Sequence, residues 1–383
     1  MAIVEAEIVE GGRWKFAANY DIIIDGCLPR ELTLEILLRL PVKSLVNFKL
    51  VCKSWNYLIS SPDFIKSRTR SSNNPTLTLL YDRYCMQLYS LNPTVSRENL
   101  SFHNNEPKFY ELIGSCDGLI CMYSPLEECI YIFNPLTKET KKISTPYHKP
   151  ARCFLEIEGV SWFGLIPSIN DYKIWLVVRI PKLNLRIHVY SMRDDNWREL
   201  DTISAFRFID DARILFWGMN AVEKNETLHC SFEYDYNEFM VKYDLVQDII
   251  ELERINLNHN QDIKYKNKPS IGILKDSSLC ICKVHALKGV MDVWKLDQYS
   301  NSDSWNKLFR LDLGLLQAPW VFLLGFISNG RILVRSSSDE LVLVDLDQNP
   351  PLQVRLGTLV NKNNSLFDLL DYSESLVSPF SLP

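Results

Sequence analysis

CLPRELTLEILLRLPVKSLVNFKLVCKSWNYLISSPDFI, residues 27–65, carries more apolar side chains than three short helices can bury against one another. The first helix is predicted to open at Leu28 and Pro29, since proline suits a first helical position, and to end at Pro41. The letters SPD at 61–63 predict a restart with an N-cap and a first-turn acid. A unit of about 40 residues is marginally stable unless a metal, a disulfide or a partner supports it. We therefore expect this segment to form half of a protein–protein interface.

The same segment resembles the F-box, by which a large class of proteins docks on the Skp adaptor of cullin-based ubiquitin ligases. The resemblance is carried by a Leu-Pro opening, an Ile-Leu pair, a Leu-Pro stop and a run ending in tryptophan: Leu28, Pro29, Ile36, Leu37, Leu40–Leu45 and Val51–Trp55. The letters LPVKSLVNFKLVCKSW are most similar to the plant version, with Asn47 and Leu50 in place of a frequent arginine and cysteine. The resemblance implies docking on a Skp-type adaptor, and through it indirectly on a cullin scaffold. The residues that we expect to bind the adaptor, some of them internal to the fold, are Leu28, Pro29, Ile36, Leu37, Leu40, Pro41, Val51, Cys52 and Trp55.

The bulk composition is that of a globular protein without a nucleic-acid or membrane partner. Of 383 residues, 46% are hydrophobic and 23% charged, and the formal net charge is −5. Nucleic acids and anionic membranes attract basic patches, which this balance does not favour. Residues 1–26 contain no basic region followed by an apolar run, and no later run approaches a membrane span. We therefore expect a cytoplasmic or nuclear protein, or one present in both compartments.

Beyond Arg70 the sequence changes to short runs of valine, isoleucine and aromatic residues between turn signals, a pattern typical of all-β domains. One strand recurs at intervals of about 50 residues, the spacing of kelch-type propeller repeats in which each unit is a four-stranded blade. Its copies are MQLYSL at 86–91, IYIFNP at 130–135, IHVYSM at 187–192, FMVKYDL at 239–245, MDVWKLD at 291–297 and LVLVDLD at 341–347. The repeat predicts a small α-helical unit followed by an all-β, kelch-like β-propeller of about six blades.

This second region resembles the F-box-associated domain of plant F-box proteins, which is often described as kelch-like. The stretches that carry the resemblance include IGSCDGLICM at 113–122, IYIFNPLTKETKKI at 130–143 and NGRILVRSSSDELVLVDLD at 329–347. With 14 glycines in the whole chain, the paired-glycine signature of true kelch repeats is missing. The predicted organisation is a flexible N-terminal segment at 1–25, an F-box at 26–68, a linker at 69–76 and a propeller-like substrate-binding domain at 77–383.

Catalytic and metal-binding patterns are weak throughout the sequence. It contains no GxSxG, P-loop, HExxH or GxGxxG motif. Cys280 and Cys282, near His285, fit inward positions of a buried strand better than a zinc site. Asp194 and Asp195 fit a turn in which they bond their own backbone better than a pair of catalytic carboxylates. We therefore expect no catalytic residue, no cofactor and no metal.

Three functions from different classes remain open at this point. The preferred one is a non-catalytic receptor subunit of a Skp-cullin-F-box ubiquitin ligase, which captures an unidentified target protein with its propeller for ubiquitination and degradation. The second is a propeller enzyme, which would need convergent carboxylates or a metal cluster. The third is a propeller scaffold or sugar-binding protein outside any ligase, for which recurring tryptophans would offer stacking surfaces. Because the tryptophans recur at equivalent repeat positions, we expect them in the core instead: Trp197, Trp294 and Trp305.

Overall fold

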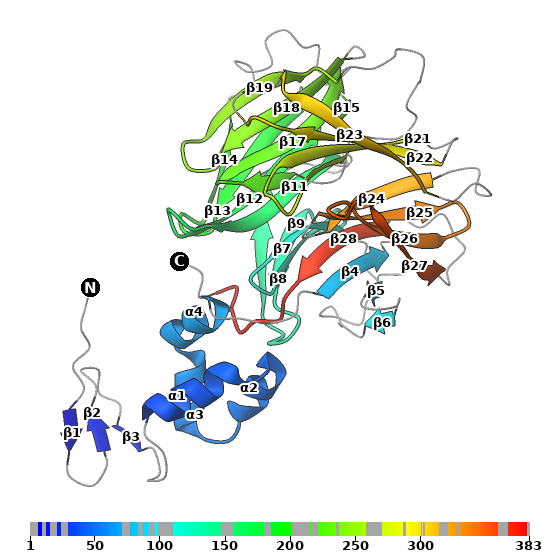
Figure 1. Ribbon diagram of the computed structural model, residues 1–383. Helices are drawn as coiled ribbons and strands as arrows, with labels where there is room; N and C mark the ends of the chain where they lie inside the picture. The colour runs from blue at the N-terminus through cyan, green and yellow to red at the C-terminus, as the bar shows by residue number, and fades with distance from the viewer. Residues whose placement is uncertain are drawn as a thin grey trace.

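In the part of the chain that it describes, a computed structural model shows four helices beneath a ring of β-sheets (Figure 1). The structure describes residues 7–9, 13–15, 21–23, 30–70, 77–82, 87–91, 96–98, 110–146, 156–179, 185–200, 215–216, 221–234, 237–257, 270–285, 289–299, 301, 303–313, 321–327, 330–358 and 367–380.

The helical unit consists of α1 (Arg30–Arg39), α2 (Val42–Phe48), α3 (Lys53–Ser60) and α4 (Pro62–Arg70). The predicted restart at 61–63 is thus a full fourth helix. Its N-cap is Ser61, whose hydroxyl oxygen accepts a hydrogen bond from the Phe64 amide at 3.3 Å. The predicted stop at Pro41 is also confirmed, since α1 ends at Arg39 and α2 begins at Val42.

The helices share one apolar core, which also takes in two side chains from the β region. The buried members from the helices are Leu37, Val42, Leu45, Ile59 and Phe64. The two contributors from outside the helices are Leu376, which is buried, and Leu136, which is partly buried.

The described residues of the β region form six sheets, which are numbered here in their order around the ring. Sheet 1 contains β28 (Phe367–Tyr372), β4 (Leu77–Asp82), β5 (Gln87–Ser90) and β6 (Ser96–Glu98). Sheet 2 contains β7 (Glu111–Cys116), β8 (Leu119–Ser124), β9 (Cys129–Phe133) and β10 (Thr140–Ser144). Sheet 3 contains β11 (Glu156–Ile166), β12 (Asp171–Arg179), β13 (Leu185–Ser191) and β14 (Asn196–Glu199). Sheet 4 has five strands: β15 (Leu215–Phe216), β16 (Val222–Lys224), β17 (Thr227–Tyr234), β18 (Asn237–Asp244) and β19 (Ile249–Ile255). Sheet 5 contains β20 (Ser270–Ile273), β21 (Leu279–His285), β22 (Val290–Leu296) and β23 (Trp305–Asp312). Sheet 6 contains β24 (Val321–Ile327), β25 (Arg331–Ser336), β26 (Glu340–Asp345) and β27 (Leu352–Thr358).

The recurring strand of the sequence repeat occupies the same place in every sheet. In the hydrogen-bonded order of each sheet, which leaves out β16 because it pairs beside β15 on β17, the six copies occupy the third position: β5, β9, β13, β18, β22 and β26. The ring closes because β28, near the end of the chain, pairs antiparallel with β4 near the start of the β region. The architecture is therefore a β-propeller in which the first sheet is completed by the last strand.

Apolar clusters fill the junctions between neighbouring sheets all the way around the ring. Separate clusters lie between sheets 1 and 2, 2 and 3, 3 and 4, 4 and 5, 5 and 6, and 6 and 1. Trp294 and Trp305 are buried between sheets 4 and 5, and Trp197 packs on Tyr190 with ring centroids 5.1 Å apart. The expectation that these tryptophans belong to the core is confirmed for Trp294 and Trp305, whereas Trp197 is only partly buried and packs against the cluster between sheets 2 and 3.

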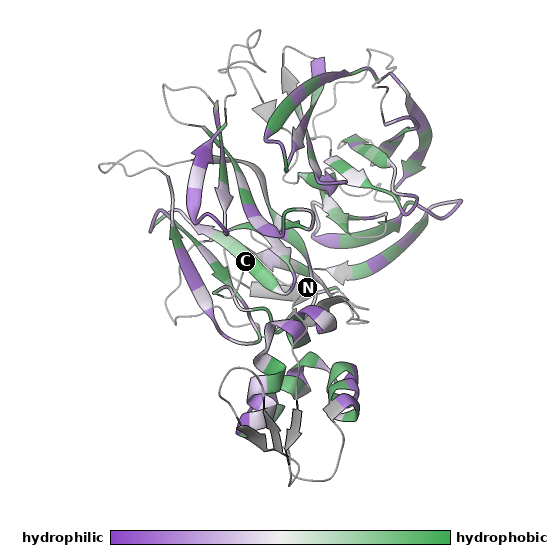
Figure 2. Ribbon diagram, turned by 90° about the vertical axis from the view of Figure 1, so that its left-hand side faces the viewer, coloured by the Kyte–Doolittle hydropathy of each residue, from purple (hydrophilic) through white to green (hydrophobic). Residues whose placement is uncertain are grey.

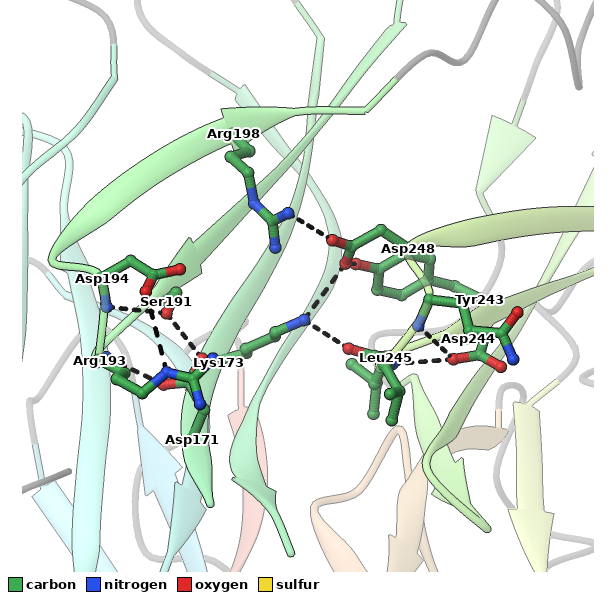
Figure 3. Close-up of polar contacts among 12 residues, drawn as sticks. Asp171, Lys173, Ser191, Arg193, Asp194, Arg198, Tyr243, Asp244, Leu245 and Asp248 are labelled. Atoms are coloured by element: carbon green, nitrogen blue, oxygen red, sulfur yellow. Dashed lines mark hydrogen bonds and ion pairs between the residues drawn. The ribbon is translucent and has the colours of Figure 1, made fainter. Parts of the chain in front are cut away.

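An ion network that includes the buried Lys173 joins sheets 3 and 4 (Figure 3). The ammonium group of Lys173, on β12, is buried, donates to the carbonyl of Leu245 and lies 3.2 Å from a carboxylate oxygen of Asp248. The second oxygen of Asp248 lies 2.6 Å from Arg198 on β14. The hydroxyl of Tyr243 also donates to Asp248. One hairpin carboxylate of sheet 4 thus pairs with two cations of sheet 3 and links the two sheets.

The N-terminal segment contains a small sheet that the sequence did not predict, formed by β1 (Glu7–Val9), β2 (Arg13–Lys15) and β3 (Asp21–Ile23). The remainder of the predicted flexible segment lies outside the described residues. Most of the predicted linker does too, at 71–76, while residues 69 and 70 belong to α4.

Candidate functional site

Hydrophobic residues lie along the helices of the helical unit (Figure 2). Several of its large apolar side chains stay exposed, although other apolar side chains of the unit pack into an internal core. On α1, Leu32 and Ile36 are separated by four residues and therefore share one face. After α2, Leu50 is 86% exposed and Val51 is 63% exposed. Tyr57 on α3 is exposed as well. Apolar side chains of this size that remain in solvent after folding are typical of a surface that another protein covers.

The exposed pair after α2 is held in place by the backbone. The amide of Leu50 donates to the carbonyl of Asn47 at 3.0 Å, and the amide of Val51 donates to that of Phe48 at 3.1 Å. These hydrogen bonds close a turn before α3. Both side chains are therefore presented by an ordered turn, which lowers the entropy cost of binding a partner.

The predicted adaptor-binding residues have different environments. Ile36, Pro41, Val51 and Cys52 are exposed, so they are available to a partner. Leu40 and Trp55 are half-buried and pack against the helical core. Trp55 contacts Phe48 edge to face, with ring centroids 5.3 Å apart. Leu28 and Pro29 lie outside the described residues.

Leu37 is the predicted docking residue that the structure places inside the helical unit. Its side chain is 1% exposed and belongs to the internal core. On α1 the buried face carries Thr33 and Leu37, whereas Leu32 and Ile36, each one residue earlier and therefore on the neighbouring face, are exposed. Leu37 therefore supports the surface from beneath and does not form part of it.

Three exposed apolar residues were missing from the predicted set: Leu32, Leu50 and Tyr57. Leu32 carried a signal, since it shares its helical spacing with Ile36. Leu50 carried one too, because it replaces a frequent cysteine with a larger apolar side chain.

The far side of the helical unit is covered by the chain itself. Leu376 is buried in the helical core, and Lys43 on α2 pairs with Glu374 at 2.9 Å. Burial lowers the pKa of Lys49, and the charge of nearby Glu139 opposes this shift. Leu32, Ile36, Leu50, Val51 and Tyr57 nevertheless stay exposed beside this internal contact.

The other chemical candidates have structural roles. Asp195 does not bond its own backbone as expected: its carboxylate accepts from the hydroxyl of Tyr190 and lies 3.4 Å from Lys141 of the neighbouring sheet. Asp194 lies 3.8 Å from Arg193. These two carboxylates are therefore engaged with different partners.

The described residues contain neither a candidate metal site nor a candidate membrane-spanning helix. Cys280 and Cys282 are buried on β21, as expected for inward positions of a strand. Among the described residues no group of three histidine, cysteine or acidic side chains could hold a metal ion. Within the same part of the chain, no helix has the length and apolarity needed to cross a membrane.

Comparison with known families agrees with this geometry. The F-box associated beta propeller domain matches residues 79–377, and the F-box domain matches residues 26–67. The chain belongs to the F-box-associated β-propeller family. Its helical unit is accordingly called the F-box below. The match is to this family, and the kelch-like character expected from the repeat length is not confirmed.

Two Arabidopsis thaliana proteins illustrate the family. The F-box/kelch-repeat protein At3g23880 is 26% identical over 311 residues, covering 74% of this chain and 79% of its own length. The F-box protein CPR1 is 24% identical over 363 residues, covering 86% of this chain and 84% of its own length. Among solved structures, a chain of the nidogen/laminin complex aligns with 79% of this chain and 100% of its own length, with a TM-score of 0.48 and 12% identity, too low to support an inference.

Proposed function

We propose that this chain is the target-recognition subunit of a Skp-cullin-F-box ubiquitin ligase. In this proposal, residues 26–68 dock on a Skp-type adaptor, which connects them to a cullin, and residues 77–383 capture a target protein for ubiquitination and degradation. The chain forms and breaks no bond itself. It raises the effective concentration of the target beside the ubiquitin-carrying enzyme.

One observation carries the proposal: the F-box keeps large apolar side chains in solvent on a unit whose core is complete and whose other side rests on the propeller. Burial of such side chains by a partner supplies most of the energy of a specific interface. The thiols described in the structure are free, which suits the reducing cytoplasm or nucleus, where we propose that the protein works.

The proposal is tested by co-purification with a recombinant Skp adaptor and cullin. Ile36→Asp places a charge in the exposed face of α1 and is expected to abolish co-purification. Leu126→Asp places the same charge at a 69% exposed leucine of the propeller and is expected to have no effect. An Ile36→Asp chain that folds and still retains the adaptor would refute the proposal.

The same pair of variants identifies targets. In proximity labelling in native tissue, degradation targets are expected to accumulate around the Ile36→Asp chain relative to the Leu126→Asp chain. If no protein differs between the two, target capture for degradation is contradicted.

A further inference from the structure

The described C-terminal end of the chain runs between the F-box and the propeller. After β28 ends at Tyr372, residues 373–380 leave the ring and pass toward the helices (Figure 1). We call residues 373–380 the C-terminal tail. It lies far from the F-box in sequence, yet it contacts both units.

The tail is tied to the propeller by a buried amide. The side-chain nitrogen of Asn134, which follows β9, donates to the carbonyl of Ser375 at 3.0 Å and to that of Val377 at 2.8 Å. The Ser375 hydroxyl donates to the carbonyl of Asp117. Val377 packs against the apolar cluster between sheets 2 and 3.

A glycine makes room for this contact. Gly118 has φ +75°, and a Cβ added there would lie 2.5 Å from the Ser375 hydroxyl oxygen and 2.8 Å from the carbonyl oxygen of Ser373. Any side chain at this position would therefore displace the tail.

The same tail is tied to the F-box by its next side chains. Leu376 is buried in the F-box core, one residue before Val377, which packs in the propeller core. Glu374 pairs with Lys43 of α2 at 2.9 Å. Two neighbouring residues of one segment thus belong to the cores of two different units, so neither unit can turn without breaking contacts of the other.

We propose that the C-terminal tail is a positioning segment that fixes the F-box against the propeller, so that the two units move as one body. The consequence rests on the proposed function: a target on the propeller is held at a constant position relative to the adaptor and the enzyme behind it. The positioning residues are Asn134, Leu376 and Glu374, and none of them belongs to the exposed apolar set of the F-box.

Asn134→Asp removes the hydrogen bonds to the tail while keeping those of the local turn. The amide oxygen of Asn134 accepts from the backbone amides of Leu136 at 2.8 Å and Thr137 at 3.2 Å, and aspartate keeps this oxygen. The donor is lost, and an oxygen then faces the carbonyls of Ser375 and Val377. Leu376→Ala removes the contact on the F-box side. Phe380→Ala, at a 64% exposed residue of the same tail, is the matched control.

The test measures the distance between two spin labels on the free full-length chain. Labels are introduced through a noncanonical amino acid at Lys53 on α3 and Ser337 after β25, both exposed, because the chain has ten cysteines. The unchanged chain and Phe380→Ala are expected to give one narrow distance distribution, and Asn134→Asp combined with Leu376→Ala a broad one. A narrow distribution in the folded double variant would overturn the proposal.

If the double variant does not fold, hydrogen exchange of Asn134→Asp alone decides. Loss of two hydrogen bonds predicts about 30-fold faster amide exchange in the tail and in α2, equal to about 2 kcal/mol at 1.4 kcal/mol per factor of ten. Unchanged exchange in α2 would overturn the proposal. Failure of the unchanged chain to bind the adaptor would instead refute the proposed function and leave the positioning role standing.

Discussion

Replacing Leu50 and Val51 together with alanine should weaken adaptor binding by a calculable amount. Complete burial of a leucine or valine side chain is worth about 1.5–3 kcal/mol. With exposed fractions of 86% and 63%, and a Cβ retained in each alanine, the pair should contribute about 2–3 kcal/mol to binding. At 1.4 kcal/mol per factor of ten, the Kd should rise about 30- to 150-fold.

The assay is isothermal titration calorimetry of the intact chain with a purified Skp adaptor. The matched control changes Leu352 and Val354 on β27 to alanine, since these are also an exposed leucine and valine, at 47% and 41%. The control pair should leave the Kd unchanged. If both double variants have the same Kd, burial of the exposed F-box side chains by the adaptor is refuted.

Three further predictions concern stability. Leu45→Ala, at a fully buried residue of the F-box core, should destabilise the F-box by about 2–5 kcal/mol, measured as faster amide exchange in α1–α3; exchange equal to that of the unchanged chain would contradict the core assignment. Asp248→Asn should lower the free energy of unfolding, measured by urea denaturation, by about 3–5 kcal/mol, because it leaves the buried Lys173 ammonium group without a carboxylate partner. Lys173→Met should cost less, because Asp248 keeps Arg198, and the reverse order would show that the network is not arranged as described. Burial lowers the pKa of His229 to about 4. Below pH 6.5 the unfolded chain therefore binds a proton at His229, whereas the native state stays unprotonated there until about pH 4. The free energy of unfolding should accordingly fall as the pH is lowered from 6.5 toward 4. His229→Gln should shrink this fall in the thermal midpoint, and an identical fall would contradict the shift.

The repeat was predictable because its signal is local. Tyr190 and Tyr243 recur in strands of the same pattern, and both occupy the third strand of their sheets. The closure of the ring was not predictable from the repeat. It depends on the pairing of β28 with β4, which lie hundreds of residues apart, and the letters DLLDY at 368–372 do not differ from those of any other short strand.

The docking surface was predictable in position but not residue by residue. Ile36 and Leu37 are adjacent apolar residues of α1, and only the packing of Val42, Leu45 and Leu376 decides that Leu37 faces inward while Ile36 faces outward. Leu376 was not predictable from the sequence, since an isolated leucine near the C-terminus carries no sign of the core that it enters.

Hydrogen exchange of the intact chain, with and without a purified Skp adaptor, tests the central claim most directly. The account predicts slower exchange in residues 30–60 on adding the adaptor, with the strands of the propeller unchanged. Unchanged exchange in the helices, or protection confined to the sheets, would contradict it.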